Sequence, residues 1–140
     1  MRHRMGGRKF GLPSDQRRAL LKGLVRSLLV FQRISTTETR AKDARILAER
    51  VITLARRNDS LHARRQVNRY LTDETLTRHV FTVIAPEFKD RPGGYTRITK
   101  VGQRRGDAAR LVILELATDR DLGRPILPEK IGTRRSEKTW

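Results

Sequence analysis

A cationic loop between two strand-like runs is the part of the sequence whose residue types most clearly suggest chemistry. The loop covers residues 102–110 and carries Arg104, Arg105 and Arg110 against a single acid, Asp107. Guanidinium groups stay charged at cellular pH and form forked hydrogen bonds to phosphate oxygens. A basic loop at the end of a hairpin therefore predicts contact with phosphates.

Two further groups of basic residues lie elsewhere in the chain. Within residues 1–13 the cations alternate with glycines, whose backbone can approach a polyanion closely, so we expect an arm that becomes ordered along phosphates. The alternative is a disordered basic terminus. Along the first predicted helix the cations recur every four residues, which is typical of a solvated face or of a face turned toward a polyanion. The arm residues are Arg2, His3, Arg4, Arg8 and Lys9, and the helical residues are Arg18, Lys22 and Arg26.

The sequence shows no set of residues suited to catalysis or to metal binding. The histidines, His3, His62 and His79, are far apart and have no partners at metal-ligand spacing. No phosphate-binding glycine loop, dinucleotide fingerprint or nucleophile motif occurs, and the acids do not suggest a converging pair. The absence of cysteine excludes disulfides and zinc ribbons. We therefore expect a protein that is not an enzyme and that needs no cofactor or metal.

The charge balance narrows the class of partner. The 140 residues include 32 Lys and Arg against 15 Asp and Glu, a formal net charge of +17. Such a charge destabilises a compact fold by self-repulsion unless a polyanion neutralises it. Nucleic acid is the favoured polyanion, and an anionic membrane surface is second. The chain has no signal-like start and no apolar run of membrane-spanning length, so we expect a cytoplasmic protein outside the membrane.

Hydrophobic periodicity predicts the elements that position these cations. Apolar residues at helical spacing alternate with short β-branched runs, and Val112, Leu114 and Leu116 share one face of the last strand. Pro86 is expected to end the fourth helix, because the residue before a proline disfavours the α region. The expected helices cover residues 14–30, 38–57, 60–70 and 72–85, and the expected strands cover residues 33–37, 95–101 and 111–116.

Several short motifs occur in a fixed order over about residues 1–116. These motifs are Met1-Arg2-His3-Arg4, Ile34-Ser35-Thr36-Thr37, Ala41-Lys42, Ile52-Thr53-Leu54-Ala55, Ala63-Arg64-Arg65, Gly93-Gly94-Tyr95-Thr96-Arg97, and Arg105-Gly106-Asp107 followed by an apolar run ending in Glu115-Leu116. With these motifs in this order, the chain resembles the family of the seventeenth protein of the bacterial large ribosomal subunit.

The resemblance implies a two-layer α/β (α+β) fold with the element order α-β-α-α-α-β-β and a small mixed sheet. We expect a basic arm at residues 1–13, a globular rRNA-binding domain at 14–117 and a C-terminal extension at 118–140. The resemblance also implies a structural constituent of the large ribosomal subunit, near the nascent-chain exit, that stabilises folded large-subunit rRNA in translation. The expected location is the ribosome, in the cytoplasm or in a plastid stroma. Neighbouring ribosomal proteins are the other expected partners, and no homo-oligomer is expected.

The predicted RNA contacts go mainly to phosphates and 2′-hydroxyls, so that RNA is recognised by its folded shape. Arm residues are expected to thread between RNA segments. Phosphates are expected to be clamped from the hairpin by Arg97, Lys100, Arg104 and Arg105. The backbone there is shaped by Gly93, Gly94 and Gly106, and Tyr95 is either a core residue or a stacking platform for a base. A second tier of contacts comes from Arg18, Lys22, Arg26, Arg64 and Arg65.

Two other classes of protein fit parts of the sequence. A DNA-binding regulator would also carry basic helical stripes, and it predicts tight binding to duplex DNA and a symmetric dimer. An RNA-processing enzyme predicts turnover on an rRNA precursor. Neither a dimer seam nor a catalytic set is visible in the sequence, which favours the structural RNA-binding protein.

Overall fold

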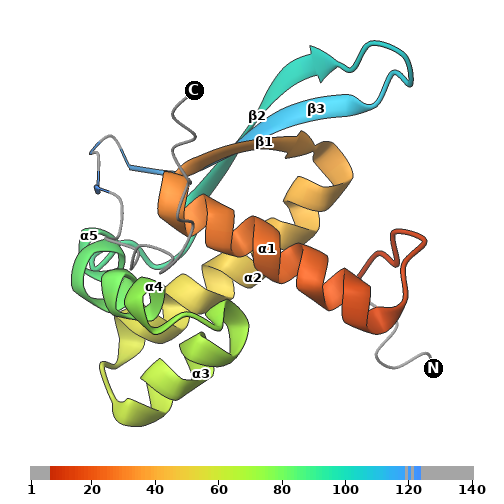
Figure 1. The fold of residues 1–140 in the computed structure, drawn as a ribbon. Coiled ribbons are helices and arrows are strands. Elements are labelled where there is room, and N and C mark those ends of the chain that lie inside the picture. Colours follow the sequence, from red (N-terminus) through yellow and green to blue (C-terminus); the bar gives the residue numbers. More distant parts are fainter. Residues whose placement is uncertain (1–6, 119, 121, 124–140) are drawn as a thin grey trace, which may run out of the picture.

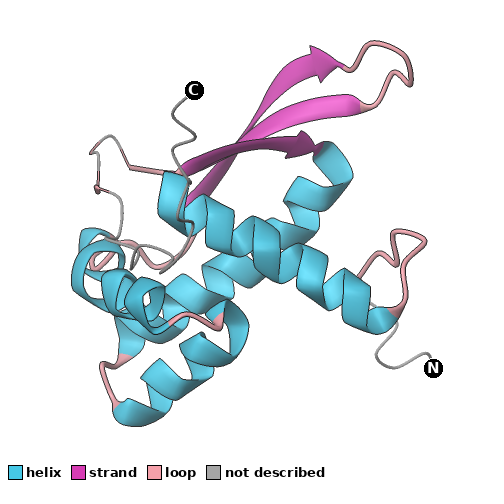
Figure 2. Cartoon of the chain, in the orientation of Figure 1, coloured by secondary structure: helices cyan, strands magenta, loops and turns pink. Residues whose placement is uncertain are grey.

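A computed structural model describes residues 7–118, 120 and 122–123. The predicted α/β fold and its element order are confirmed, except that the fourth helix is divided into three consecutive segments (Figures 1 and 2). The strands are β1 (Arg33–Thr37), β2 (Thr96–Gln103) and β3 (Arg110–Leu116). The helices are α1 (Ser14–Phe31), α2 (Glu38–Arg57), α3 (Leu61–Leu71), α4 (Glu74–His79), the π-helical η1 (Val80–Ile84) and α5 (Ala85–Glu87).

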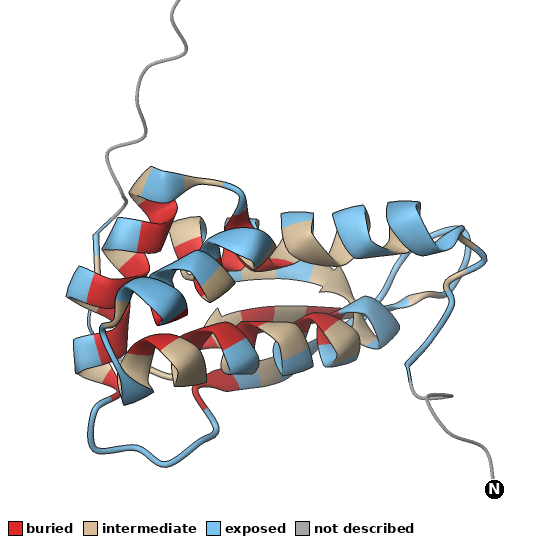
Figure 3. Cartoon of the chain, turned by 90° about the horizontal axis from the view of Figure 1, so that it is seen from below, coloured by how far each residue is buried: buried red, intermediate tan, exposed pale blue. Residues whose placement is uncertain are grey.

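The described elements form two layers. The sheet lies over α1 and α2, which cross beneath it, while α3, α4 and α5 gather at the end away from the β2–β3 hairpin tip (Figure 1). One face of each long helix is buried and the opposite face is exposed (Figure 3). This arrangement leaves the hairpin tip projecting beyond the helical layer.

The three strands are paired in the order β1-β3-β2, and both pairings are antiparallel. The expectation of a mixed sheet was therefore wrong. After β2 the chain turns back through the hairpin and inserts β3 between β1 and β2. As a result β1 and β2 run in the same direction but never pair with each other, and β3 is antiparallel to both. Register places Ile34 and Ile98 on either side of Leu114.

The core lies between the sheet and the helices, as the strand pattern predicts. Val112 and Leu114 are fully buried and Leu116 nearly so. On α2 the inward positions are small, and Ala44 and Ala48 have no exposed surface. Because an alanine side chain is only a methyl group, α2 can lie close to both α1 and the strands, and it contacts them all. The hairpin is thereby fixed to the longest helix.

The fourth helix does not end before Pro86, contrary to the sequence expectation. It passes through the π-helical segment η1, in which the Ala85 N–H donates to the Val80 carbonyl, and continues to Glu87 as α5. Pro86 lies in the first turn of α5, where its missing N–H and fixed φ are tolerated. The change of hydrogen-bond register in η1 thus directly precedes the turn that contains the proline.

Candidate nucleic-acid interface

The hairpin tip is organised by a fork between Arg104 and Asp107. The Arg104 guanidinium donates from Nε to Oδ1 over 3.0 Å and from Nη2 to Oδ2 over 2.6 Å. Asp107 also accepts the N–H of Ala109 over 3.2 Å. The Arg104 fork, followed by this backbone donor, lowers the pKa of Asp107 to about 2. The tip is therefore a closed turn and not a loose loop.

Arg105 lies beside this fork and is exposed. Within the described residues it forms no ion pair. The neighbouring Gly106 has φ +109°, a conformation that L residues with a side chain rarely adopt. The positive φ of Gly106 is therefore a physical reason for the role predicted for it in shaping the turn. Arg105, next to it, is exposed on this turn.

A charged row crosses the outer face of the sheet. Arg97 on β2 donates from Nε to Glu115 on β3 over 2.8 Å, and Arg33 on β1 lies 3.6 Å from the same carboxylate. Both arginine side chains remain more than half exposed. Arg97 is therefore held in place on the sheet surface and keeps unused N–H groups, because an arginine has five donors.

An acidic residue at the N-terminus of α2, Glu38, interacts with other cations of the hairpin. Glu38 has a lowered pKa, chiefly because Lys42 hydrogen-bonds to it, with smaller contributions from Arg110 and Lys100. Lys100 is exposed at the edge strand β2. The structure thus places the predicted cations Arg97, Lys100, Arg104 and Arg105 on one hairpin. Of these, Arg97 and Arg104 are paired with acids, whereas Arg105 forms no ion pair with another described residue.

The described part of the N-terminal arm rests on α2. Arg8 pairs with Asp43, with 3.0 Å between Nη1 and Oδ1, and its backbone N–H donates to the same carboxylate. Lys9 is exposed. The remaining arm residues named above, Arg2, His3 and Arg4, lie outside the described residues, so their predicted contacts stay predictions.

The helical cations divide into two groups. On α1, Lys22 donates to the Arg69 carbonyl over 2.7 Å and Arg26 lies 3.5 Å from Asp73, so two of the three stripe residues turn toward α3 and α4. Arg18 is exposed. On α3, Arg64 forms a fork with Asp59 and also lies 5.4 Å from the Phe81 ring, whereas the neighbouring Arg65 is exposed.

Tyr95 is a core residue and not a stacking platform. Only 1% of it is exposed, and its ring centroid lies 5.3 Å from that of Phe88. A buried ring offers no face to a base, so Tyr95 is removed from the candidate contacts. Gly93 and Gly94 precede it in an exposed turn, and Gly94 has φ +66°.

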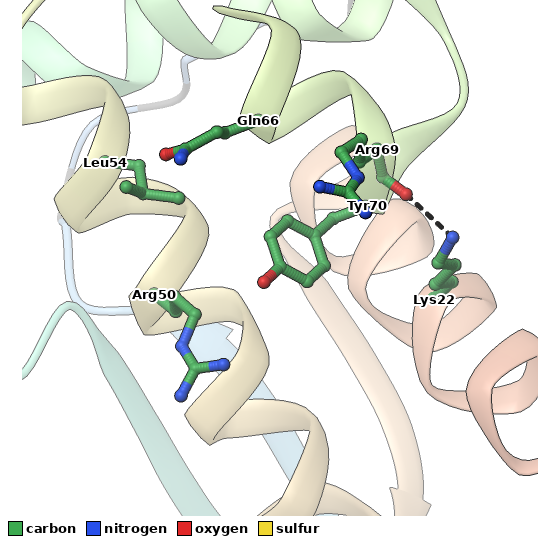
Figure 4. A pocket seen from close by; sticks show the side chains of 6 residues that line it. All are labelled: Lys22, Arg50, Leu54, Gln66, Arg69 and Tyr70. Atoms are coloured by element: carbon green, nitrogen blue, oxygen red, sulfur yellow. Dashed lines mark hydrogen bonds between the residues drawn. The ribbon is translucent and has the colours of Figure 1, made fainter. Parts of the chain in front are cut away.

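A basic groove that the sequence analysis missed runs across α1, α2 and α3 (Figure 4). It consists of two adjoining cavities of about 550 and 530 Å³ that share Lys22, Arg50 and Tyr70. Arg17 and Arg69 add to its charge. These residues come from three helices and have no common spacing along the chain. The sequence signals were Lys22, which belongs to the predicted helical cations, and Tyr70, an aromatic residue at the end of a basic helix.

The described residues contain neither a metal-ligand cluster nor a membrane-spanning helix. Among them no three His, Asp or Glu side chains come together as metal ligands. None of the described helices combines the length and the apolar character that a bilayer crossing requires.

Comparison with known proteins finds relatives that match most of the chain. The sequence pattern of the family described as "Ribosomal protein L17" matches residues 20–117. The chain is 60% identical over 112 residues to "Large ribosomal subunit protein bL17" of Desulforudis audaxviator, covering 80% of this chain and 99% of that protein. The protein of the same name from a Thermoanaerobacter species is 58% identical with the same coverage, and that of Clostridium kluyveri is 61% identical, covering 78% of this chain and 96% of that protein. With a match over most of its length, the chain belongs to the ribosomal protein L17 family.

Proposed function

We propose that this protein is a structural constituent of the large ribosomal subunit. It binds large-subunit rRNA through phosphates and 2′-hydroxyls and stabilises the folded RNA in translation. Its relatives are named as large-subunit proteins, and this chain covers nearly their whole length. The proposed location is accordingly the ribosome, where neighbouring ribosomal proteins are further partners.

The observation that carries the RNA contact is a surplus of exposed cations without acidic partners. In the described part of the chain, no carboxylate lies within ion-pair distance of Lys9, Arg18, Arg65 or Arg105. With a net charge of +17, the folded chain cannot neutralise these groups internally. RNA phosphates supply the missing negative charge, and their release of counterions drives binding.

The arginines that are paired with carboxylates are proposed to contribute to RNA binding in a different way from the unpaired cations. Arg8, Arg97 and Arg104 are each held by one carboxylate. Such a pair fixes the guanidinium in position, and the N–H groups that remain can donate to a phosphate. The unpaired cations supply attraction, while the paired ones favour a particular shape of RNA.

The test is the salt dependence of binding to protein-free large-subunit rRNA. If about eight phosphates are neutralised, log K falls with log salt at a slope of roughly −6 to −7. Arg105→Ala is expected to weaken binding and to make the slope shallower by about 1, since one phosphate contact is lost. Arg45→Ala is the matched control, because Arg45 is an exposed arginine of α2 that is not among the residues proposed to contact RNA.

A slope shallower than about −2 would contradict the phosphate contacts. Equal slopes for the wild type and Arg105→Ala would remove the hairpin tip from the interface. Sedimentation of cell extract tests the assembly itself: the protein is expected to remain with the large subunit through a moderate-salt wash. Free protein at the top of the gradient would refute the proposal.

A further inference from the structure

We propose that the groove across α1, α2 and α3 receives a single nucleotide unstacked from the rRNA, with its base against Tyr70 and its phosphate among the arginines of the rim. This α1–α3 groove comprises both adjoining cavities: Lys22, Arg50 and Tyr70 line both, Leu54, Gln66 and Arg69 line the first, and Arg17, Asp43 and Ile46 are among the residues that line the second. The inference rests on the function proposed above and adds a specific subsite to it.

The groove has the size of a ligand site. Each of its two adjoining cavities, about 550 and 530 Å³, falls within the range of about 300–1,000 Å³ typical of small-molecule sites. The three shared residues make them one depression, which extends from Gln66 on α3 to the arm at Arg8. A nucleotide and the backbone on one side of it can therefore lie along the groove.

The floor of the groove is apolar and contains one aromatic ring. Tyr70 is half-buried and packs against the core, and Figure 4 shows its ring between α1 and α2. Leu54 lies beside it on α2, and Ile46 further along is 64% exposed. Within the part of the chain described here, the Tyr70 hydroxyl makes no hydrogen bond. RNA bases stack on aromatic side chains of this kind when they leave the helical stack.

The rim of the groove is cationic and almost free of acids. Arg17, Arg50 and Arg69 have no carboxylate within ion-pair distance among the described residues, and Lys22 is held by the Arg69 carbonyl. The single acid, Asp43, is already paired with Arg8. By contrast, Arg45 on the same helix as Arg50 has its own glutamate. The unneutralised charge is thus concentrated around the aromatic floor.

This combination distinguishes a nucleotide from other anions. A free phosphate uses the rim but leaves the Tyr70 ring and Leu54 in contact with water. A duplex presents phosphates but keeps its base faces stacked inside. An unstacked nucleotide offers a flat apolar face and an anionic group on the same residue, which matches the floor and the rim together. An acidic segment of a neighbouring protein is the other occupant that the charge admits, and the test separates the two.

The first measurement is the affinity for protein-free large-subunit rRNA. Tyr70→Leu is expected to weaken binding roughly tenfold, because loss of one base–aromatic stack has about that effect. Tyr70→Phe keeps the ring and is expected to recover most of the lost affinity. Arg50→Ala is expected to weaken binding and to reduce the salt slope by about 1, whereas the control Arg45→Ala leaves both unchanged. Circular dichroism checks that each variant is folded, and Arg50→Ala decides the matter if Tyr70→Leu does not fold.

The second measurement is base-directed chemical probing of the rRNA in the complex. One unpaired base is expected to be protected by the wild type and by Tyr70→Phe, and to become reactive with Tyr70→Leu. Wild-type affinity and protection in both Tyr70→Leu and Arg50→Ala would overturn the nucleotide subsite and favour an acidic protein segment. Failure of the wild type to bind rRNA at all would instead overturn the proposed function, so the two failures are distinguishable.

Discussion

Arg104 and Arg105 are adjacent in the sequence but differ in what they can bind. Arg104 forms a fork with Asp107 that closes the turn, whereas Arg105 is exposed and forms no ion pair with another described residue. The sequence predicted that both would clamp phosphates. It could not separate them, because the pairing depends on the turn conformation that Gly106 permits. At this scale, residue type identifies a cation, and geometry decides how many of its N–H donors remain available.

The Arg104–Asp107 fork gives a prediction at the level of one carboxyl group. The pKa of Asp107 lies at about 2 in the folded protein, below its ordinary value of 3.8. A lowered folded-state pKa means that the ionised carboxylate stabilises the turn above pH 3.8, and that this contribution is lost as pH falls toward 2. We expect an NMR pH titration of the Asp107 carboxyl to show this low midpoint.

Arg104→Gln is expected to move the Asp107 midpoint upward toward 3.8, because the fork is the largest cause of the shift. Asp59 provides the control: its pKa is lowered by Arg64 on another element, and it should not respond to Arg104→Gln. An Asp107 titration near 3.8 in the wild type would show that the fork does not persist in solution.

Individual elements follow the hydrophobic pattern closely. The first two helices and the buried face of β3 come directly from apolar spacing, since burial of one face is what that spacing encodes. Two features of the fold could not be predicted from hydrophobic spacing. The π-helical η1 depends on a shift of hydrogen-bond partner that no residue pattern marks, and it carries the helix past Pro86. The central position of β3 depends on pairing between strands that are distant in sequence.

The alanine face of α2 makes a prediction about packing between elements. Ala48 has no exposed surface, so Ala48→Leu forces a larger side chain into a filled space and is expected to lower the free energy of unfolding by about 1–3 kcal/mol. Ala19→Leu on α1 is the matched control, because Ala19 is exposed and a surface change stays within about 0.5 kcal/mol. Urea unfolding of both variants provides the measurement. Equal stabilities would mean that α2 is not closely packed at Ala48.

At the scale of the whole molecule, the sequence could indicate which candidate residues lie together only where those residues are close along the chain. The hairpin cations lie close together along the chain, so their joint position could be inferred from sequence. The α1–α3 groove brings together Arg17, Arg50 and Tyr70 from three helices. Their proximity results from how the helices cross, and helix crossing is set by the packing of the whole core.

The same distribution of charge links RNA binding to the stability of the free protein. Without bound RNA, unpaired cations repel one another. The unpaired arginines of the groove should therefore destabilise the RNA-free fold. Arg50→Gln keeps a long side chain and removes one such charge. At low salt we expect it to raise the free energy of unfolding by about 0.5 kcal/mol while weakening binding to rRNA. The gain should disappear in 1 M KCl, where the screening length falls to about 3 Å.

Arg45→Gln separates this effect from a general benefit of losing an arginine. Arg45 is paired with Glu49, 3.0 Å away, so its removal exposes a carboxylate and relieves no repulsion. The unfolding free energy of Arg45→Gln should therefore not rise at low salt. Thermal or urea unfolding of the three proteins at 0.05 and about 1 M KCl tests the argument, with screening lengths between roughly 15 and 3 Å. A rise in the free energy of unfolding of Arg50→Gln that is the same at both salt concentrations would show that charge repulsion is not its cause. The free fold would then tolerate the charge of the groove without a loss of stability.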